Sequence, residues 1–219
     1  MLNFVIVLEC FGIILTAIAL FLLLNGDGAR EQKVLIIIMC SSMVQNVGYL
    51  LELIAPTMEA AMTAVTVEKV GSAFIPLCYC WFIYIYCYTT PPKILLRILG
   101  VISFLSLPSV IFNWNGLFYR DVRWVANEDG FYHVSLNYGP LYVFFLIGHI
   151  IIPYALCIFT LTRAIHERSD RQVNRQYWTI LLISTLPVVV LISYVCKLVK
   201  VFDFTPVTLT ISMALVVIV

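Results

Sequence analysis

Long apolar runs separated by short polar segments make up almost the whole chain. A transmembrane helix needs about 20 consecutive, mainly apolar residues. Runs that meet or nearly meet this template occupy residues 2–24, 34–54, 63–88, 94–112, 140–163, 176–198 and 204–219. Only one of the intervening segments, residues 113–139, is long. The pattern therefore predicts an all-α membrane protein built as a seven-transmembrane helix bundle.

The composition agrees with a membrane protein. Of the 219 residues, 62% are hydrophobic and 11% are charged, against about 25% charged in soluble domains. The first run lacks the basic start and the small-residue cleavage site of a signal peptide, so we interpret it as the first helix of the bundle. The formal net charge of +1 gives no reason to expect a nucleic-acid partner.

The positions of lysine and arginine predict the orientation, because cytoplasmic loops carry the excess of these residues. With the N-terminus outside, the eight basic residues at inner helix ends are Arg30, Lys33, Lys93, Arg97, Arg163, Arg168, Arg171 and Arg175. The five at outer ends are Lys69, Arg120, Arg123, Lys197 and Lys200. We therefore expect an N-out, C-in protein of the inner (plasma) membrane.

Ionisable residues inside the predicted helices gather toward the outer side. A charge in hydrocarbon costs at least about 2.5 to 3.5 kcal/mol, so it normally faces a partner or a water-filled cavity. We predict an outer-leaflet, ligand-binding chamber formed by Glu9, Gln45, Tyr49, Glu52, Glu68, Lys69, His149, Tyr194, Lys197 and Asp203. Two alternatives stay open: the lysines snorkel to the headgroups, or the polar groups only hold the helices together.

Glu68 and Lys69 are adjacent near the start of the third run. Adjacent residues on a helix point about 100° apart, so we expect each of the two to face a different partner. By sign, Lys69 should face Glu52 or Asp203. Glu68 should face one of the lysines that end the sixth run.

Residues 117–136 predict an extracellular β-hairpin between the fourth and fifth helices. Two strand-like runs, LFYRDVRWV and FYHVSL, are joined by ANEDG, in which Asn, Asp and Gly favour a turn. The hairpin would lie over the mouth of the bundle. Both a moving lid and a static cap fit this pattern.

Several motifs occur in a fixed order along the chain. They are GYLLEL with Gly48, Tyr49 and Glu52, EKVGSAFIP with Lys69, Gly71 and Pro76, NGLFYRDVRW followed by LNYGPLY, and DFTPVTLTISMAL. Together they span nearly the whole chain, which resembles the N-terminal seven-transmembrane sensor region of bacterial histidine kinases. Related signalling proteins such as diguanylate cyclases also carry this region. The resemblance implies a receptor module that precedes a cytoplasmic output domain.

Other functional classes fit the sequence less well. A retinal protein needs a lysine in its last helix, and residues 204–219 contain none. No HExxH or similar ligand pair occurs, so we expect neither a metal, nor a cofactor, nor an intramembrane enzyme. A small secondary transporter is the alternative function, although the prolines inside the helices do not form the matched broken segments of transporter repeats.

We therefore expect residues 1–219 to form one sensor domain that binds a small extracellular or lipid-like ligand. The signal would pass through the sixth and seventh helices, or through a homodimer that they form, to the cytoplasmic output domain. The last apolar run has 16 residues and would rise only about 24 Å. We expect a longer protein to supply the remainder of this helix and the output domain.

Overall fold

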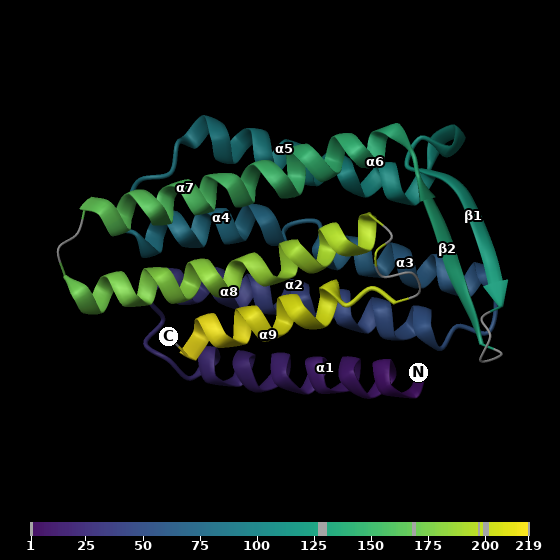
Figure 1. Cartoon of the computed structure of the whole chain (residues 1–219), viewed down its shortest axis with the longest axis horizontal. Helices are drawn as coiled ribbons and strands as arrows, with labels where there is room; N and C mark the ends of the chain where they lie inside the picture. Colours follow the sequence, from purple (N-terminus) through teal and green to yellow (C-terminus); the bar gives the residue numbers. More distant parts are fainter. Residues whose placement is uncertain (1, 127–130, 168–169, 197, 199–201, 219) are drawn as a thin grey trace.

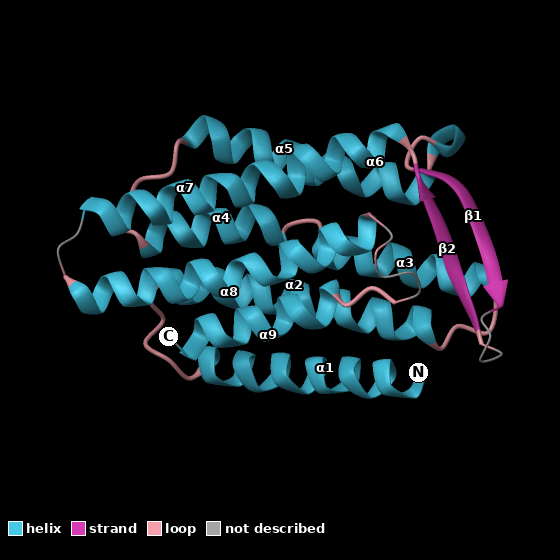
Figure 2. Ribbon diagram, in the orientation of Figure 1, coloured by secondary structure: helices cyan, strands magenta, loops and turns pink. Residues whose placement is uncertain are grey.

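Helices form most of the structure (Figures 1 and 2). The computed structural model describes residues 2–126, 131–167, 170–196, 198 and 202–218. The chain is mostly helical, at 79%, and the strands of the described residues form one small sheet. The prediction of a mainly α-helical protein is therefore confirmed, and one small sheet adds to the helices.

Four of the apolar runs form single long helices close to their predicted bounds. These are α1 (Leu2–Leu24), α2 (Arg30–Leu53), α5 (Lys93–Phe112) and α8 (Arg171–Val195). With two longer, interrupted stretches they give six candidate membrane spans in the described part of the chain. The last helix, α9 (Thr205–Ile218), has 14 residues and rises about 21 Å, less than the roughly 30 Å hydrocarbon core.

The third run is broken into two helices, α3 (Met58–Ser72) and α4 (Ile75–Tyr86). The prediction of one continuous helix over residues 63–88 was therefore wrong in two respects. The segment begins earlier, because the Thr57 hydroxyl accepts a hydrogen bond from the α3 backbone and caps the helix. It also breaks before Pro76, which lies in the first turn of α4, where its missing N–H leaves no helical bond unmade.

The fifth run is also irregular. It consists of α6 (Pro140–Phe145), a π-helical turn η2 (Leu146–Ile151) and α7 (Ile152–Glu167). Pro153 has no N–H, and its ring excludes the carbonyl four residues earlier, which belongs to His149. The wider π turn ends just before this proline and accommodates it.

The predicted hairpin is present as two antiparallel strands, β1 (Tyr119–Ala126) and β2 (Tyr132–Tyr138). Asn113 fixes the entry into β1, because its side-chain oxygen accepts from the Tyr119 N–H at 2.8 Å and its amide donates to the Tyr119 carbonyl. The predicted turn at residues 127–130 lies outside the described residues.

The helices run up and down the long axis of the molecule, with the sheet across one end (Figure 1). The start of α1 lies at the sheet end, and the end of α9 lies at the opposite end. α2 packs against α1, α3, α4 and α9. The largest apolar core includes Ile38, Tyr79 and Leu161, whereas a smaller cluster around Phe118 and Phe145 lies against the sheet.

Polar contacts hold α9 near its middle. The buried Thr210 hydroxyl accepts a hydrogen bond from the Asn46 amide at 2.7 Å and lies 2.8 Å from the Ser42 hydroxyl. Both partners belong to α2. α9 also packs against α1 and α8, so the last helix is enclosed on three sides by earlier helices.

Candidate functional site

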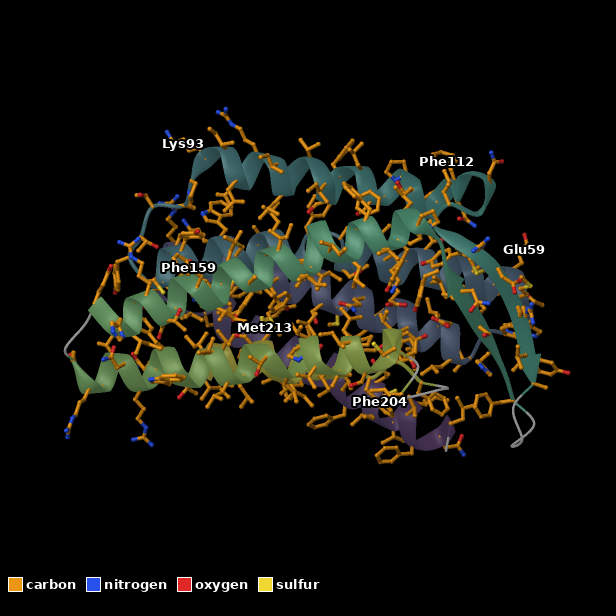
Figure 3. The ribbon with its side chains drawn as sticks, turned by 45° about the horizontal axis from the view of Figure 1, so that its top comes forward. Glu59, Lys93, Phe112, Phe159, Phe204 and Met213 are labelled. Carbon is orange, nitrogen blue, oxygen red and sulfur yellow. The ribbon has the colours of Figure 1, made fainter. Side chains whose placement is uncertain are left out.

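A cavity of about 120 Å³ lies between α3, α5, η2, α8 and the start of α9, and we call it the main cavity. Its polar lining consists of Gln45, Glu68, Lys69, Ser72, Ser106, Tyr142, His149, Tyr154, Asp203 and Thr205. The remaining lining is mainly aliphatic and aromatic, with Ile75, Phe145, Leu191 and Leu209 among its members. Figure 3 draws the described side chains along the whole chain and places Phe204, next to Asp203, toward the sheet end. The lining of the main cavity therefore combines charged side chains with apolar ones.

Two glycines set the positions of Gln45 and Glu68 by letting α2 and α3 approach closely. A Cβ atom on Gly48 would lie 2.6 Å from the Glu68 Cα, and one on Gly71 would lie 2.9 Å from the Gln45 Cα. Real Cβ atoms do not tolerate such distances from backbone atoms. Small residues at a membrane helix interface permit this kind of backbone contact. Both polar side chains are consequently fixed on rigid, closely packed helices.

Glu68 and Lys69 form an ion pair with each other, with 2.7 Å between Lys69 Nζ and Glu68 Oε1. The prediction that adjacent residues face different partners was wrong. The four-carbon lysine side chain is long enough to fold back along the helix surface, which overcomes the angular separation of the two Cα–Cβ bonds. The lysines at the end of the sixth run, Lys197 and Lys200, lie outside the described residues, so the predicted partners of Glu68 are not placed.

Asp203 connects the main cavity to the start of α9. Its backbone N–H donates to the Tyr49 hydroxyl at 2.8 Å, and its Oδ1 accepts from the Thr205 N–H at 2.8 Å. Asp203 is buried. Burial raises the pKa of its carboxyl above the usual range, while the Lys69 ammonium opposes this rise. One side chain thus caps α9, lines the main cavity and interacts with the charge of Lys69.

Two buried oxygens in the main cavity have no hydrogen-bond partner among the described residues. They are Gln45 Oε1 and Thr205 Oγ1. Gln45 is only 4% exposed. Buried polar groups of native proteins almost always have a partner, so an unpaired one needs an explanation. Each of these two oxygens could accept a hydrogen bond from a donor placed in the main cavity.

His149 lies on the π turn and lines the main cavity. It is 8% exposed, and its Nδ1 lies 3.2 Å from the Ser103 hydroxyl of α5. The neighbouring Ser106 hydroxyl donates to the Ser103 carbonyl at 2.7 Å. The π turn therefore directs a histidine and the helix α5 directs two serines to the same part of the bundle.

Other predicted site residues surround a second, smaller cavity beneath the sheet. Its lining includes Tyr49, Glu52, Tyr194 and Asp203, together with His133 and other residues of the hairpin. Asp203 belongs to both cavities. The residues predicted to form one chamber are thus divided between two neighbouring cavities that share one aspartate.

Glu9 and Lys197 complete the predicted set. Glu9 is fully buried in α1, lines neither cavity, and has no hydrogen-bond partner for either carboxyl oxygen among the described residues. Lys197 lies outside the described residues. Only part of the predicted set can therefore be assigned to the main cavity.

Sequence reasoning missed several polar residues of the main cavity, among them Ser72, Ser106, Tyr142 and Thr205. A signal existed for Ser72, which follows Glu68 by four residues and so lies on the same helix face. Ser106, Tyr142 and Thr205 gave no such signal, because their positions depend on how separate helices pack. In the part of the chain that the structure describes, no three His, Cys, Asp or Glu side chains gather as metal ligands would.

The chain matches a known protein family over nearly its whole length. The family described as the N-terminal 7TM region of histidine kinase matches residues 7–219. No curated protein sequence matches the chain. The family match and the apolar helices indicate a multi-pass protein of the inner membrane. The resemblance to histidine-kinase sensor regions that the motifs indicated is confirmed, and this family is a membrane sensor module rather than a catalytic domain. The chain therefore belongs to the family of N-terminal 7TM regions of histidine kinases.

Proposed function

We propose that this sensor module binds a small ligand in the main cavity and transmits its presence to a cytoplasmic histidine kinase. The observation that supports this most directly concerns Gln45, which is 4% exposed and lines the same cavity as the Glu68–Lys69 pair. Its buried Oε1 has no hydrogen-bond partner among the described residues. A partly desolvated polar lining of this kind is typical of ligand sites, where a few polar groups orient a ligand within apolar walls.

We further propose an N-out, C-in topology with α9 as the seventh span. The excess of basic residues at the predicted inner ends supports this orientation. The start of α1 and the end of α9 lie at opposite ends of the bundle (Figure 1), as an odd number of crossings requires. In this topology the sheet and both cavities belong to the extracellular side, and the ligand reaches them from outside or from the outer leaflet.

The proposed signal is a shift of α9. Asp203 and Thr205 line the main cavity at the start of α9, so a ligand that contacts them favours one position of this helix over another. The end of α9 would carry the shift to the output domain, either within one copy or through a homodimer. A ligand can change this equilibrium only by as much as its affinities for the two positions differ.

Co-purification tests the proposed function. We would purify the chain and its Gln45→Leu variant from cells and analyse the bound small molecules by mass spectrometry, with Val44→Leu as the matched control. Val44 neighbours Gln45 but is exposed on the outside of the bundle. We expect a molecule that the parent and Val44→Leu retain and Gln45→Leu loses. Equal retention by all three proteins, or retention by none, would count against a ligand site in the main cavity.

A transporter is the second candidate, because two interrupted helices border the main cavity. The break between α3 and α4 and the π turn η2 both contribute lining residues. Interrupted helices at a central polar site occur in secondary transporters. Reconstituted vesicles separate the two functions: a transporter accumulates the co-purified molecule inside the vesicle, whereas a receptor only binds it.

A further inference from the structure

An apolar groove adjoins the main cavity between α7 and α8. It has a volume of about 160 Å³ and a lining without exposed polar surface. Its lining consists of Tyr154, Cys157, Ile158, Leu161, Leu181, Ser184, Thr185, Val188 and Val189. Tyr154 and Val188 also line the main cavity. The two spaces are therefore neighbours that share a wall, and we call the second one the α7–α8 groove.

The α7–α8 groove opens toward the outside of the bundle. Two of its lining residues, Ile158 and Val189, are 42% and 58% exposed. Because these residues belong to candidate membrane spans, their exposed faces meet lipid rather than water. The lining extends from Tyr154 to Leu161 on α7, a rise of about 11 Å at 1.5 Å per residue. This length suits one medium-length alkyl chain.

The volume also favours a single chain. A cavity of about 150 Å³ lined by aliphatic and aromatic residues holds one benzene ring and stays free of water. The α7–α8 groove, at about 160 Å³, has room for a similar amount of hydrocarbon. It therefore fits part of one alkyl chain and not the two acyl chains of a phospholipid.

The main cavity determines which head group fits beside such a chain. Gln45 Oε1 offers an unused acceptor, and the Lys69 ammonium already donates to Glu68. Among the described lining residues, Glu68 and Asp203 are acids and Lys69 is the only lysine or arginine. A head group that donates hydrogen bonds, such as an amide N–H or a hydroxyl, is complementary to this set, whereas a carboxylate is not.

Resting on the proposed function, we propose that the ligand is a single-chain amphiphile with a small, uncharged head that donates hydrogen bonds. The head lies in the main cavity against Gln45 and Asp203. The alkyl chain lies in the α7–α8 groove, and the molecule enters sideways from the outer leaflet. The class is thus defined by one alkyl chain and a donor head, as in an N-acyl amide of an amino alcohol.

A photoreactive probe tests this proposal. The probe is N-decanoyl ethanolamide with a diazirine at the end of its chain, applied to the protein in lipid nanodiscs, and the adducts are located by peptide mass spectrometry. We expect adducts within residues 154–161 and 181–189 that excess unlabelled amide prevents. The lipid-exposed Phe21 of α1 should carry only adducts that the competitor leaves unchanged.

Variants locate the two parts of the ligand. Thr185→Phe fills the α7–α8 groove and should abolish the competed adducts, whereas the matched control Leu186→Phe changes a neighbouring, exposed residue outside the groove and should preserve them. Gln45→Leu should weaken competition by up to about tenfold, the value of one hydrogen bond. Thr205→Val offers a second test of the head site if Gln45→Leu fails to fold.

Four results would overturn the proposal. Adducts that spread over α1 as much as over the α7–α8 groove would show ordinary partition into lipid. Equal effects of Thr185→Phe and Leu186→Phe would exclude the groove, and equal labelling by the corresponding diazirine-tagged decanoic acid would exclude a donor head. A co-purified molecule without an alkyl chain that Gln45→Leu loses would contradict this proposal and leave the proposed function intact.

Discussion

Replacement of Lys69 by Met should reveal how strongly the Glu68–Lys69 pair stabilises the bundle. The variant removes the ammonium that lies 2.7 Å from a carboxylate whose side chain is 5% exposed. Loss of one partner from a buried pair typically costs about 3 to 5 kcal/mol, because the other charge is left without compensation. Lys69 itself is 26% exposed, so water partly screens the pair and the lower part of this range applies.

Protonation of Glu68 limits the stability that Lys69→Met can lose. A carboxyl group with the reference pKa of about 4.3 can be neutralised at pH 7 for about 1.36 kcal/mol per pH unit, or about 4 kcal/mol. We therefore expect Lys69→Met to reduce the free energy of unfolding by about 3 kcal/mol at pH 7. Glu68→Gln should cost less, about 1 kcal/mol, because the remaining lysine can reach water through its long side chain. The double variant, Lys69→Met with Glu68→Gln, should have about the same free energy of unfolding as Glu68→Gln alone.

Equilibrium unfolding in mixed detergent micelles, followed by circular dichroism, provides the four free energies of this cycle. The predicted coupling between the two sites is about 3 kcal/mol, the difference between the loss of about 3 kcal/mol that Lys69→Met causes with Glu68 present and the absence of a loss when Glu68 is already replaced. If the two single losses simply add in the double variant, the ion pair does not stabilise the fold. The reasoning about a desolvated pair would then be refuted.

Three further predictions concern other parts of the molecule. Gly48→Ala should lower the melting temperature, because its Cβ would overlap the α3 backbone at a cost of about 1 to 3 kcal/mol. Gly100→Ala is the control: its Cβ would meet only one side-chain atom at 3.9 Å, so it should stabilise α5 by about 0.5 to 1 kcal/mol. Equal shifts of the melting temperature in the two variants would contradict the close-packing argument. Burial lowers the pKa of His133 below its usual value, so the packed hairpin binds fewer protons than the open one, and its stability should fall as the pH drops through the usual histidine pKa. The hydrogen-exchange protection factors of the strand amides, which correct for the slower intrinsic exchange at lower pH, should fall in that window. An unchanged pH response in His133→Asn would assign the effect to another group. A reporter fused after Val219 should be cytoplasmic and one inserted into residues 127–130 extracellular; the reverse pattern would invert the topology.

The sequence predicts the helices of this protein well, because the bilayer fixes both the length and the composition of a spanning segment. The runs at residues 2–24 and 94–112 agree closely with α1 and α5. The hairpin was predictable for a related reason, since its turn residues separate two short strand-like runs. Each of these features depends on local sequence alone.

The arrangement of the candidate site was only partly predictable. Their positions near the predicted outer ends of the apolar runs placed Gln45, Glu68 and Asp203 toward one end of the bundle, and the structure brings them to one cavity. It did not predict that Lys69 folds back to Glu68, because this depends on a flexible side chain rather than on the helix. The π turn that carries His149 also escaped prediction, because proline permits a kink without determining its form.

The polar contacts of Thr210 give α9 the geometry of a lever. The hydroxyl is held by Ser42 and Asn46 of α2, so this point of the helix acts as a fulcrum. From Thr210 the arm to Thr205 measures about 8 Å and the arm to Ile218 about 12 Å at 1.5 Å per residue. If α9 tilts as a rigid rod, a displacement of about 1 Å beside the main cavity becomes about 1.5 Å at the far end, in the opposite direction. The bundle would thus enlarge and invert the motion that a ligand produces, without any helix sliding along its neighbours.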